Sequence, residues 1–151
     1  MSGDLSALYN EIITDHKKTP RNFKVVDRAT ATIDGYNPLC GDKVKVSLRT
    51  EGDTIADIGF VGEGCAISIA SASLMTGAVK GKTVAEAEQL FATFHAMISN
   101  PTSVVDAKAL GKVAALGGAR QHASRSKCAS LAWHALHAAL TQSAAESVST
   151  E

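Results

Sequence analysis

The spacing of apolar residues changes from helical to alternating along the first half of the chain. Apolar side chains recur every three or four positions over residues 5–18, which predicts an amphipathic helix that Pro20 ends. Apolar and polar residues then alternate over residues 29–36, 42–50 and 55–62, and the turn sequence EGDT separates the last two segments. Alternation with a period of two is typical of half-buried strands, so these segments predict an antiparallel meander.

The spacing is helical again after residue 65. The Ala/Ser-rich segment 66–81 predicts a buried helix that ends at Gly81. Thr83 and Glu86 have the spacing of a capping box, in which each residue's side chain bonds the other's backbone N–H. An apolar stripe follows over residues 84–97, and it predicts a second amphipathic helix.

The rest of the chain predicts two loops and two further helices. We expect a loop at residues 100–101, a short helix near residues 104–116 and a second loop over the sequence GGARQHAS at residues 117–124. The last helix is expected over residues 125–140, with Trp133 in the core.

This order of elements predicts an α+β fold, in which a small antiparallel three-stranded sheet packs against several helices. A chain of 151 residues suits one domain with one core. We assign residues 1–142 to a single domain. Residues 143–151 have little to bury and are expected to form a disordered C-terminal tail.

Composition and charge exclude several classes of protein. Hydrophobic residues make up 45% and charged residues 20% of the chain, as in globular proteins. No apolar run approaches the ~18 residues of a membrane span, and the N-terminus does not resemble a secretion signal. Fifteen basic residues balance fifteen acidic ones, which argues against nucleic-acid binding. Three cysteines without a C-x-x-C pair do not suggest a disulfide framework, so we expect a cytoplasmic protein.

The three cysteines lie at positions unusual for packing residues. Cys40 lies in the turn sequence NPLCGDK just before an expected strand, and Cys65 follows GEG in the first turn of an expected helix. Cys128 is expected in the first turn of the last helix, with Ser124 as the cap. Helix N-termini favour thiolates, and three thiolates with the Asp42 carboxylate would complete a tetrahedral zinc shell. Widely spaced single cysteines are also common as small buried apolar residues, so packing stays open as an alternative.

Four segments together resemble the U-type (IscU/NifU-like) proteins of iron–sulfur cluster biogenesis. They are LYNEIITDHKKTPRN, NPLCGD, GEGCAISIASASLM and RSKCASLAWHAL, in the family's order between Leu8 and Leu140. The chain is more similar to the SufU branch of zinc-dependent sulfurtransferases than to the IscU scaffold branch. The scaffold branch has a histidine before its third cysteine, where this chain has Lys127, and the SufU branch has a longer segment before that cysteine and an Arg-x-Lys-Cys block. The chain departs from the pattern at residues 123–124, where a proline is expected.

The resemblance implies one Zn²⁺ ion bound by Cys40, Asp42, Cys65 and Cys128. It implies a SufU/IscU-like fold and a pyridoxal-phosphate-dependent cysteine desulfurase of the SufS type as partner. A histidine of that desulfurase would displace Cys40 from zinc, and Cys40, as the catalytic residue, would accept persulfide sulfur and pass it to a SufBCD-type scaffold complex.

Two alternatives stay open. One is an IscU-type scaffold that assembles a [2Fe–2S] cluster on the same four ligands. The other is a structural zinc module that activates the desulfurase by docking. Among the histidines, His16 lies with Arg21 in a segment that resembles the family. These two residues could contact a partner or could simply end the helix, and the sequence favours neither interpretation. His134 and His137 are three residues apart, and we expect them on a solvated helix face.

Overall fold

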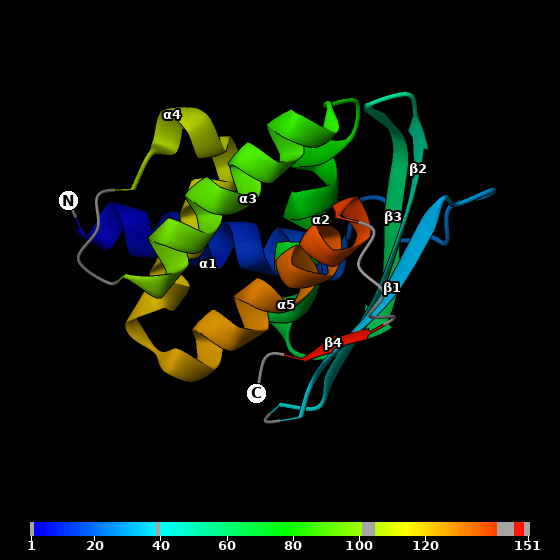
Figure 1. Ribbon diagram of the computed structural model, residues 1–151. Helices are drawn as coiled ribbons and strands as arrows, with labels where there is room; N and C mark the ends of the chain where they lie inside the picture. The colour runs from blue at the N-terminus through cyan, green and yellow to red at the C-terminus, as the bar shows by residue number, and fades with distance from the viewer. Residues whose placement is uncertain (1, 39, 101–104, 142–146, 150–151) are drawn as a thin grey trace.

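The computed structural model describes residues 2–38, 40–100, 105–141 and 147–149 (Figure 1). The elements are, in chain order, α1 (Ser2–Lys18), β1 (Ala31–Asn37), β2 (Asp42–Glu51), β3 (Thr54–Glu63), α2 (Ala66–Val79), α3 (Val84–Ser99), α4 (Ala107–Leu110), the 3₁₀ helix η1 (Gly111–Gln121), α5 (Ala123–Leu140) and β4 (Ser147–Ser149). None of the helices in these ranges is long and apolar enough to span a membrane.

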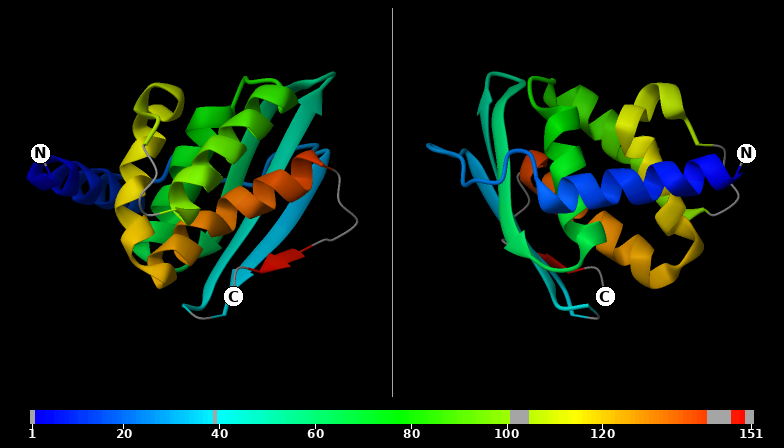
Figure 2. Two further views of the ribbon diagram at one scale, coloured as in Figure 1. Left: turned by 60° about the vertical axis from the view of Figure 1, so that its left-hand side comes forward. Right: turned by 180° about the vertical axis from the view of Figure 1, so that it is seen from behind.

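The sheet has the strand order β3-β2-β1-β4, and the helices lie on one of its faces (Figures 1 and 2). The pairs β1–β2 and β2–β3 are antiparallel, which confirms the expected three-stranded meander and the α+β fold. The short strand β4 pairs with β1 in parallel. Residues 147–149 were expected within a disordered tail and instead form this strand, while residues 143–146 and 150–151 lie outside the described part of the chain.

The core lies between the sheet and α5, with α2 and α3 on the other sides of that helix. Trp133 of α5 is fully buried, as expected, and its ring stacks on Phe94 of α3 with the centroids 4.4 Å apart. Its indole Nε1–H donates to Ser71 Oγ of α2 at 3.1 Å, and the Ser71 hydroxyl donates to the Ala129 carbonyl. These contacts fix α2, which starts at one cysteine, against α5, which contains another.

The capping box at α3 is formed as the sequence predicts. The Glu86 backbone N–H donates to Thr83 Oγ1 at 3.1 Å, and the Thr83 N–H donates to Glu86 Oε1 at 3.0 Å. Helix α2 ends just before Gly81, which has a φ of +83° that favours glycine.

The expected loop over residues 117–124 is wrong. Residues up to Gln121 belong to η1, and α5 already begins at Ala123. Gly118 lies against α1, where a Cβ atom would come 2.8 Å from Cγ of Tyr9. This glycine therefore permits a close approach of two elements and does not mark a loop. The expected helix near 104–116 corresponds to α4 and the first part of η1, while Asn100 ends α3 and Pro101 lies outside the described residues.

Candidate metal centre

Cys40 is exposed and lies in the tight turn between β1 and β2. The Gly41 N–H donates to the Asn37 carbonyl at 2.8 Å and closes this turn, and Gly41 has a φ of +74° that favours glycine. The turn has no regular element of its own, so Cys40 has fewer backbone restraints than a cysteine on a helix.

Asp42 is the first residue of β2 and is completely buried, with 0% of its surface exposed. Its Oδ1 accepts the Cys65 backbone N–H at 2.8 Å, and its Oδ2 accepts from Nδ2 of the buried Asn37 at 3.3 Å. Two donors therefore orient the carboxylate, as a buried polar group requires. The same Asn37 Nδ2 lies 3.6 Å from Sγ of Cys128, so this amide connects the carboxylate to a thiol.

Gly64 makes room for this carboxylate. A Cβ atom built on Gly64 would collide with Asp42 Oδ1, and the residue has a φ of +156°. The glycine of the GEG sequence thus allows the start of α2 to approach β2 closely enough for the Cys65 N–H to reach Asp42.

Cys65 is half-buried at the N-cap of α2, next to the position expected from the sequence. Its Sγ accepts the Ser68 N–H at 3.4 Å and lies 3.8 Å from Asp42 Oδ2. The free N–H groups of the first helical turn stabilise negative charge on a thiol at this position.

Cys128 is 4% exposed, and its Sγ lies 3.4 Å from Sγ of Cys40. The expectation that it lies in the first turn of the last helix, capped by Ser124, is wrong. Because α5 begins at Ala123, Cys128 is in the second turn, and the N-cap is His122 without a side-chain cap bond. Burial is the largest cause that raises the pKa of the Cys128 thiol, followed by its contacts with Asp42, Cys40 and Cys65.

The ligand atoms of Cys40, Asp42 and Cys128 all lie within 4.8 Å of one another. Over the described ranges, no other group of three or more His, Cys, Asp or Glu residues has this proximity. Cys65 is outside the group of three, but its thiol faces the same carboxylate. Collecting buried thiolates and a carboxylate is unfavourable unless a cation offsets their charge. The donor set fits a borderline-soft divalent ion such as zinc, for which thiolates are preferred ligands.

Two residues near the thiols did not stand out in the sequence. Asn37 precedes a proline in a turn and gives no signal of its bond to a residue 91 positions away. Tyr9 of α1 has a buried hydroxyl without a hydrogen-bond partner among the described residues. Burial raises the pKa of Tyr9 most, the charges of Cys65 and Cys128 raise it further, and Arg125 lowers it. Helical periodicity places Tyr9 in the core but does not place it near the cysteines.

The other histidines of the sequence analysis lie elsewhere. His16 of α1 is buried, and its Nδ1 lies 2.7 Å from Ser73 Oγ of α2. His134 and His137 are not on a fully solvated face, because both are partly covered by Phe91 of α3. The His137 ring stacks on Phe91 with the centroids 4.6 Å apart, and its Nδ1 lies 2.9 Å from Glu88 Oε1.

Residues 8–129 match the model of the NifU-like N terminal domain. The chain belongs to this family. It is 40% identical to the zinc-dependent sulfurtransferase SufU of Bacillus subtilis over 89% of this chain and 90% of that protein. It is 39% identical to the iron–sulfur cluster assembly scaffold protein IscU of Streptococcus pyogenes over 93% of this chain and 87% of that protein.

Solved structures of family members have the same fold. A crystal structure from Fervidobacterium islandicum, described as an iron–sulfur cluster assembly scaffold protein for the SUF system, superimposes with a TM-score of 0.81 at 32% identity, over 89% of this chain and 97% of that one. The N-terminal part of a NifU-like protein from Brucella abortus also gives a TM-score of 0.81, at 20% identity over 89% of this chain and 93% of that one. The expected SufU/IscU-like fold is confirmed.

Proposed function

We propose that this protein acts in iron–sulfur cluster assembly as a zinc-dependent sulfurtransferase with Cys40 as the sulfur acceptor. The observation that carries the proposal is the contrast within the thiol cluster: Cys40 is exposed on a turn, whereas its neighbour Cys128, 3.4 Å away, is buried in a helix. The sulfur donor is a pyridoxal-phosphate-dependent cysteine desulfurase of the SufS type, and the receiver is a SufBCD-type scaffold complex. The name and similarity of the Bacillus relative support the zinc-dependent sulfurtransferase activity.

The residues that hold the metal in this proposal are Cys40, Asp42, Cys65 and Cys128. Zinc, when bound, keeps thiol ligands deprotonated at neutral pH and takes no part in redox chemistry. Asp42 is already oriented by the Cys65 N–H and by Asn37. Cys65 and Cys128 are restrained by their helices, so their thiols stay in place when Cys40 moves.

The step assigned to Cys40 is a sulfur transfer between two cysteines. The Cys40 thiolate attacks the terminal sulfur of a persulfide on the desulfurase and forms a new S–S bond. The S–S bond of the donor persulfide breaks, and the donor cysteine leaves as a thiolate. Cys40 then holds the persulfide, and no external oxidant or reductant is required. Attack requires an accessible thiolate, and Cys40 is the exposed member of the three.

The test of the acceptor uses Cys40→Ser in a single-turnover reaction with a cysteine desulfurase. We expect the variant to fold and dock on the desulfurase but to transfer no sulfur, because a hydroxyl cannot form the persulfide. Mass spectrometry of the trapped wild-type protein should show one added sulfur on the peptide that contains Cys40. Added sulfur found only on Cys65 or Cys128, or normal transfer by Cys40→Ser, would show that the acceptor is assigned wrongly. Normal stimulation of the desulfurase by Cys40→Ser would instead favour the docking module.

The test of the metal is the zinc content of protein purified without oxygen. We expect one zinc ion per chain and its loss in Cys65→Ser and Cys128→Ser, because a neutral hydroxyl is a poor ligand for this ion. Asp42→Ala should weaken binding less, since water can replace a carboxylate oxygen. Full zinc occupancy in the Cys128 variant would contradict the ligand set.

A second candidate is an IscU-type scaffold that assembles a [2Fe–2S] cluster on the same residues. The 39% identity to the Streptococcus scaffold protein favours it. Iron content and a visible absorption band separate the two, because zinc is colourless. A stable coloured cluster after reconstitution with iron and sulfide, together with normal cluster delivery by a variant that transfers no persulfide, would support the scaffold.

A further inference from the structure

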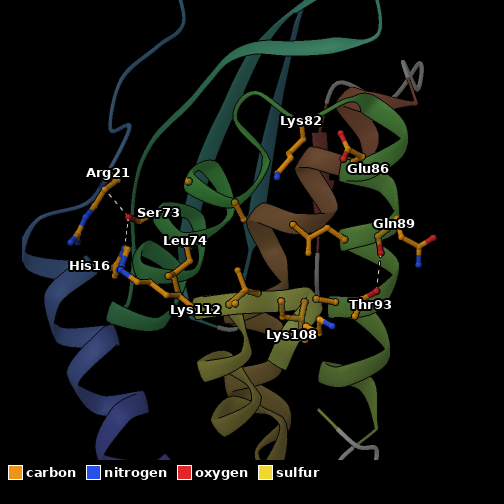
Figure 3. Close-up of a pocket in the computed structure, with 17 residues that line it drawn as sticks. His16, Arg21, Ser73, Leu74, Lys82, Glu86, Gln89, Thr93, Lys108 and Lys112 are labelled. Carbon is orange, nitrogen blue, oxygen red and sulfur yellow. Dashed lines mark hydrogen bonds between the residues drawn. The ribbon is translucent and has the colours of Figure 1, made fainter. Parts of the chain in front are cut away.

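A second site lies away from the cysteines, in a cavity of about 610 Å³ between α1, α2, α3 and the segment α4–η1 (Figure 3). None of the four proposed metal ligands lines it. Pockets of about 300–1,000 Å³ are the usual size for small organic ligands. The cavity is therefore large enough to hold one such molecule.

The interior wall of the cavity is apolar. Leu74 and Ala78 of α2, Leu90 of α3, and Leu110 and Val113 of the α4–η1 segment all line it. On α2, Gly77 also faces the cavity, and a Cβ atom there would have no other atom within 4 Å. An apolar body can thus pack on this wall without displacing protein atoms.

The charged residues of the cavity are mostly basic. Arg21, Lys82, Lys108 and Lys112 line it, and they come from four different segments of the chain (Figure 3). Because the whole chain has fifteen basic and fifteen acidic residues, this group is a local excess and not a general property of the surface. Low-dielectric walls beside such a group strengthen its field toward an anion in the cavity.

The acidic partners of these cations are few. Glu86 is the lining carboxylate, and it already accepts the backbone N–H of Thr83 in the capping box. Arg21 pairs with Asp15 at 2.9 Å, outside the lining. Over the described residues, the side chains of Lys82, Lys108 and Lys112 form no salt bridge and no hydrogen bond, although the Lys82 charge is a minor cause that lowers the pKa of Glu86. Three ammonium groups therefore remain available to a ligand.

His16 and Ser73 add a polar point to the same wall. Ser73 Oγ accepts the Arg21 backbone N–H at 2.8 Å, so the Ser73 hydrogen is available to His16 Nδ1 at 2.7 Å. With Nδ1 as the acceptor, the proton of the neutral ring is on Nε2, which can donate to an anionic oxygen. Both residues line the cavity.

We propose that this cavity binds a small organic anion, with an apolar body on its apolar lining and a phosphate, carboxylate or sulfonate group held by the basic residues that line it. The apolar wall distinguishes this ligand from inorganic phosphate, which has no apolar part to bury. The unpaired ammonium groups distinguish it from a neutral lipid or steroid. The cavity is separate from the cysteines, so the proposal of anion binding does not depend on the proposal of sulfur transfer.

The test uses a pair of probes that differ in one charged group. 8-Anilinonaphthalene-1-sulfonate has the apolar body and an anionic group, and N-phenyl-1-naphthylamine has the same body without the sulfonate. We expect saturable binding of the sulfonate at one site per folded chain, about tenfold or more tighter than the neutral probe. In ¹H–¹⁵N spectra, the shifted amides should lie in residues 74–82 and 108–113.

Two kinds of variant locate the binding. Lys108→Glu with Lys112→Glu should weaken binding of the sulfonate about tenfold, because two attractive charges become repulsive. The matched control is Lys43→Glu with Lys45→Glu, which makes the same change in charge on exposed positions of the sheet and should alter affinity less than about twofold. Gly77→Phe should abolish binding, because the ring begins from an open Cβ position and extends into the space that the ligand would occupy.

Several results would overturn the proposal. They are equal binding of the two probes, equal effects of the two double variants, unchanged binding in Gly77→Phe, and amide shifts confined to the sheet or to the cysteine turn. Melting curves identify any variant that fails to fold. If the lysine variant unfolds, the Gly77 variant and the pair of probes still decide the question.

Discussion

Asp42 is the most restrained of the candidate ligands. Its carboxylate is completely buried and accepts hydrogen bonds from the Cys65 backbone and from Asn37. This arrangement depends on the absence of a side chain at Gly64, directly beside Oδ1. The restraint therefore comes from a residue that has no functional group of its own.

Gly64→Ala tests this dependence. The added methyl group would collide with the Asp42 carboxylate, so we expect the variant to lose about 2–3 kcal/mol of unfolding free energy and to bind metal more weakly. Denaturant unfolding and metal analysis measure the two effects. Gly77→Ala is the control, because its Cβ position is open and lies in a helix, so it should be neutral or stabilising by about 0.5–1 kcal/mol. Equal stability of the two variants would contradict the argument.

At this scale, the sequence could predict residue types but not their contacts. The pattern places Cys40 in a turn and Cys65 at a helix start, because turn and helix signals are local. The bond from Asn37 toward Cys128 spans 91 positions and leaves no local signal. The position of Cys128 in its helix was predicted wrongly because the sequence GGARQHAS, in which Gly118 fits against Tyr9, looks like a loop.

Side chains at the N-caps of α2 and α3 bond backbone N–H groups of the first helical turn. Cys65 is the N-cap of α2, where its thiol accepts the Ser68 N–H, and Thr83 is the N-cap of α3, where it forms a complete capping box. Both arrangements satisfy N–H groups that a helix start leaves without a partner. The capping box was predictable because it depends on two residues three positions apart.

Thr83→Ala measures the contribution of the capping box. We expect a loss of about 1 kcal/mol of unfolding free energy and a melting temperature lower by about 2–4 °C, because the Glu86 N–H loses its acceptor. Thr93→Ala is the matched control, since Thr93 lies inside α3 and its hydroxyl bonds to the Gln89 carbonyl of the same helix. A larger effect at Thr93 than at Thr83 would show that the capping box contributes little.

The contact between α3 and α5 contains three imidazole rings around Phe91. The His95 ring contacts the His134 ring, and Glu88 pairs with His137. Burial lowers the pKa of His134 most, and the charges of His95 and His137 lower it further. A histidine with a lowered folded-state pKa resists protonation, so its effect on stability is absent above its unfolded-state pKa of 6.5 and becomes destabilising as the pH falls below it.

We therefore expect the melting temperature to fall between about pH 7.5 and about pH 5.5, and to fall less in His134→Gln. Differential scanning fluorimetry over this range measures both. The control His122→Gln removes an exposed histidine before α5 and should change the pH profile less than His134→Gln does. An identical profile for His134→Gln and the wild-type protein would mean that this ring does not couple folding to protonation.

The whole molecule brings together thiols from three distant parts of the chain. The β1–β2 turn, the start of α2 and the second turn of α5 meet because α5 packs on both the sheet and α2. The hydrophobic periodicity of the sequence predicts most of the helices and strands, and from these follow the layers and the fold class. The position of α5 depends on packing contacts such as that of Trp133 with Phe94 of α3, and a single sequence does not reveal these contacts.

Removal of zinc by a strong chelator should lower the melting temperature by about 10 °C or more, because structural zinc sites supply on the order of 10 kcal/mol of apparent binding energy at neutral pH. Added zinc should restore the original curve. In Cys65→Ser and Cys128→Ser, the chelator should have little effect. An unchanged melting curve after verified zinc removal would show that bound zinc does not stabilise the fold.

The hydrogen bonds of Ser71 have a consequence for how the family can evolve. Its hydroxyl accepts from the Trp133 indole and donates to the Ala129 carbonyl, so one small side chain of α2 bonds two groups of α5 at once. Loss of that hydroxyl leaves a buried indole N–H without an acceptor, and loss of the indole leaves an empty volume. Neither substitution is neutral alone, so we expect positions 71 and 133 to change together among homologues, with a ring lacking an N–H wherever the serine is replaced by an apolar residue.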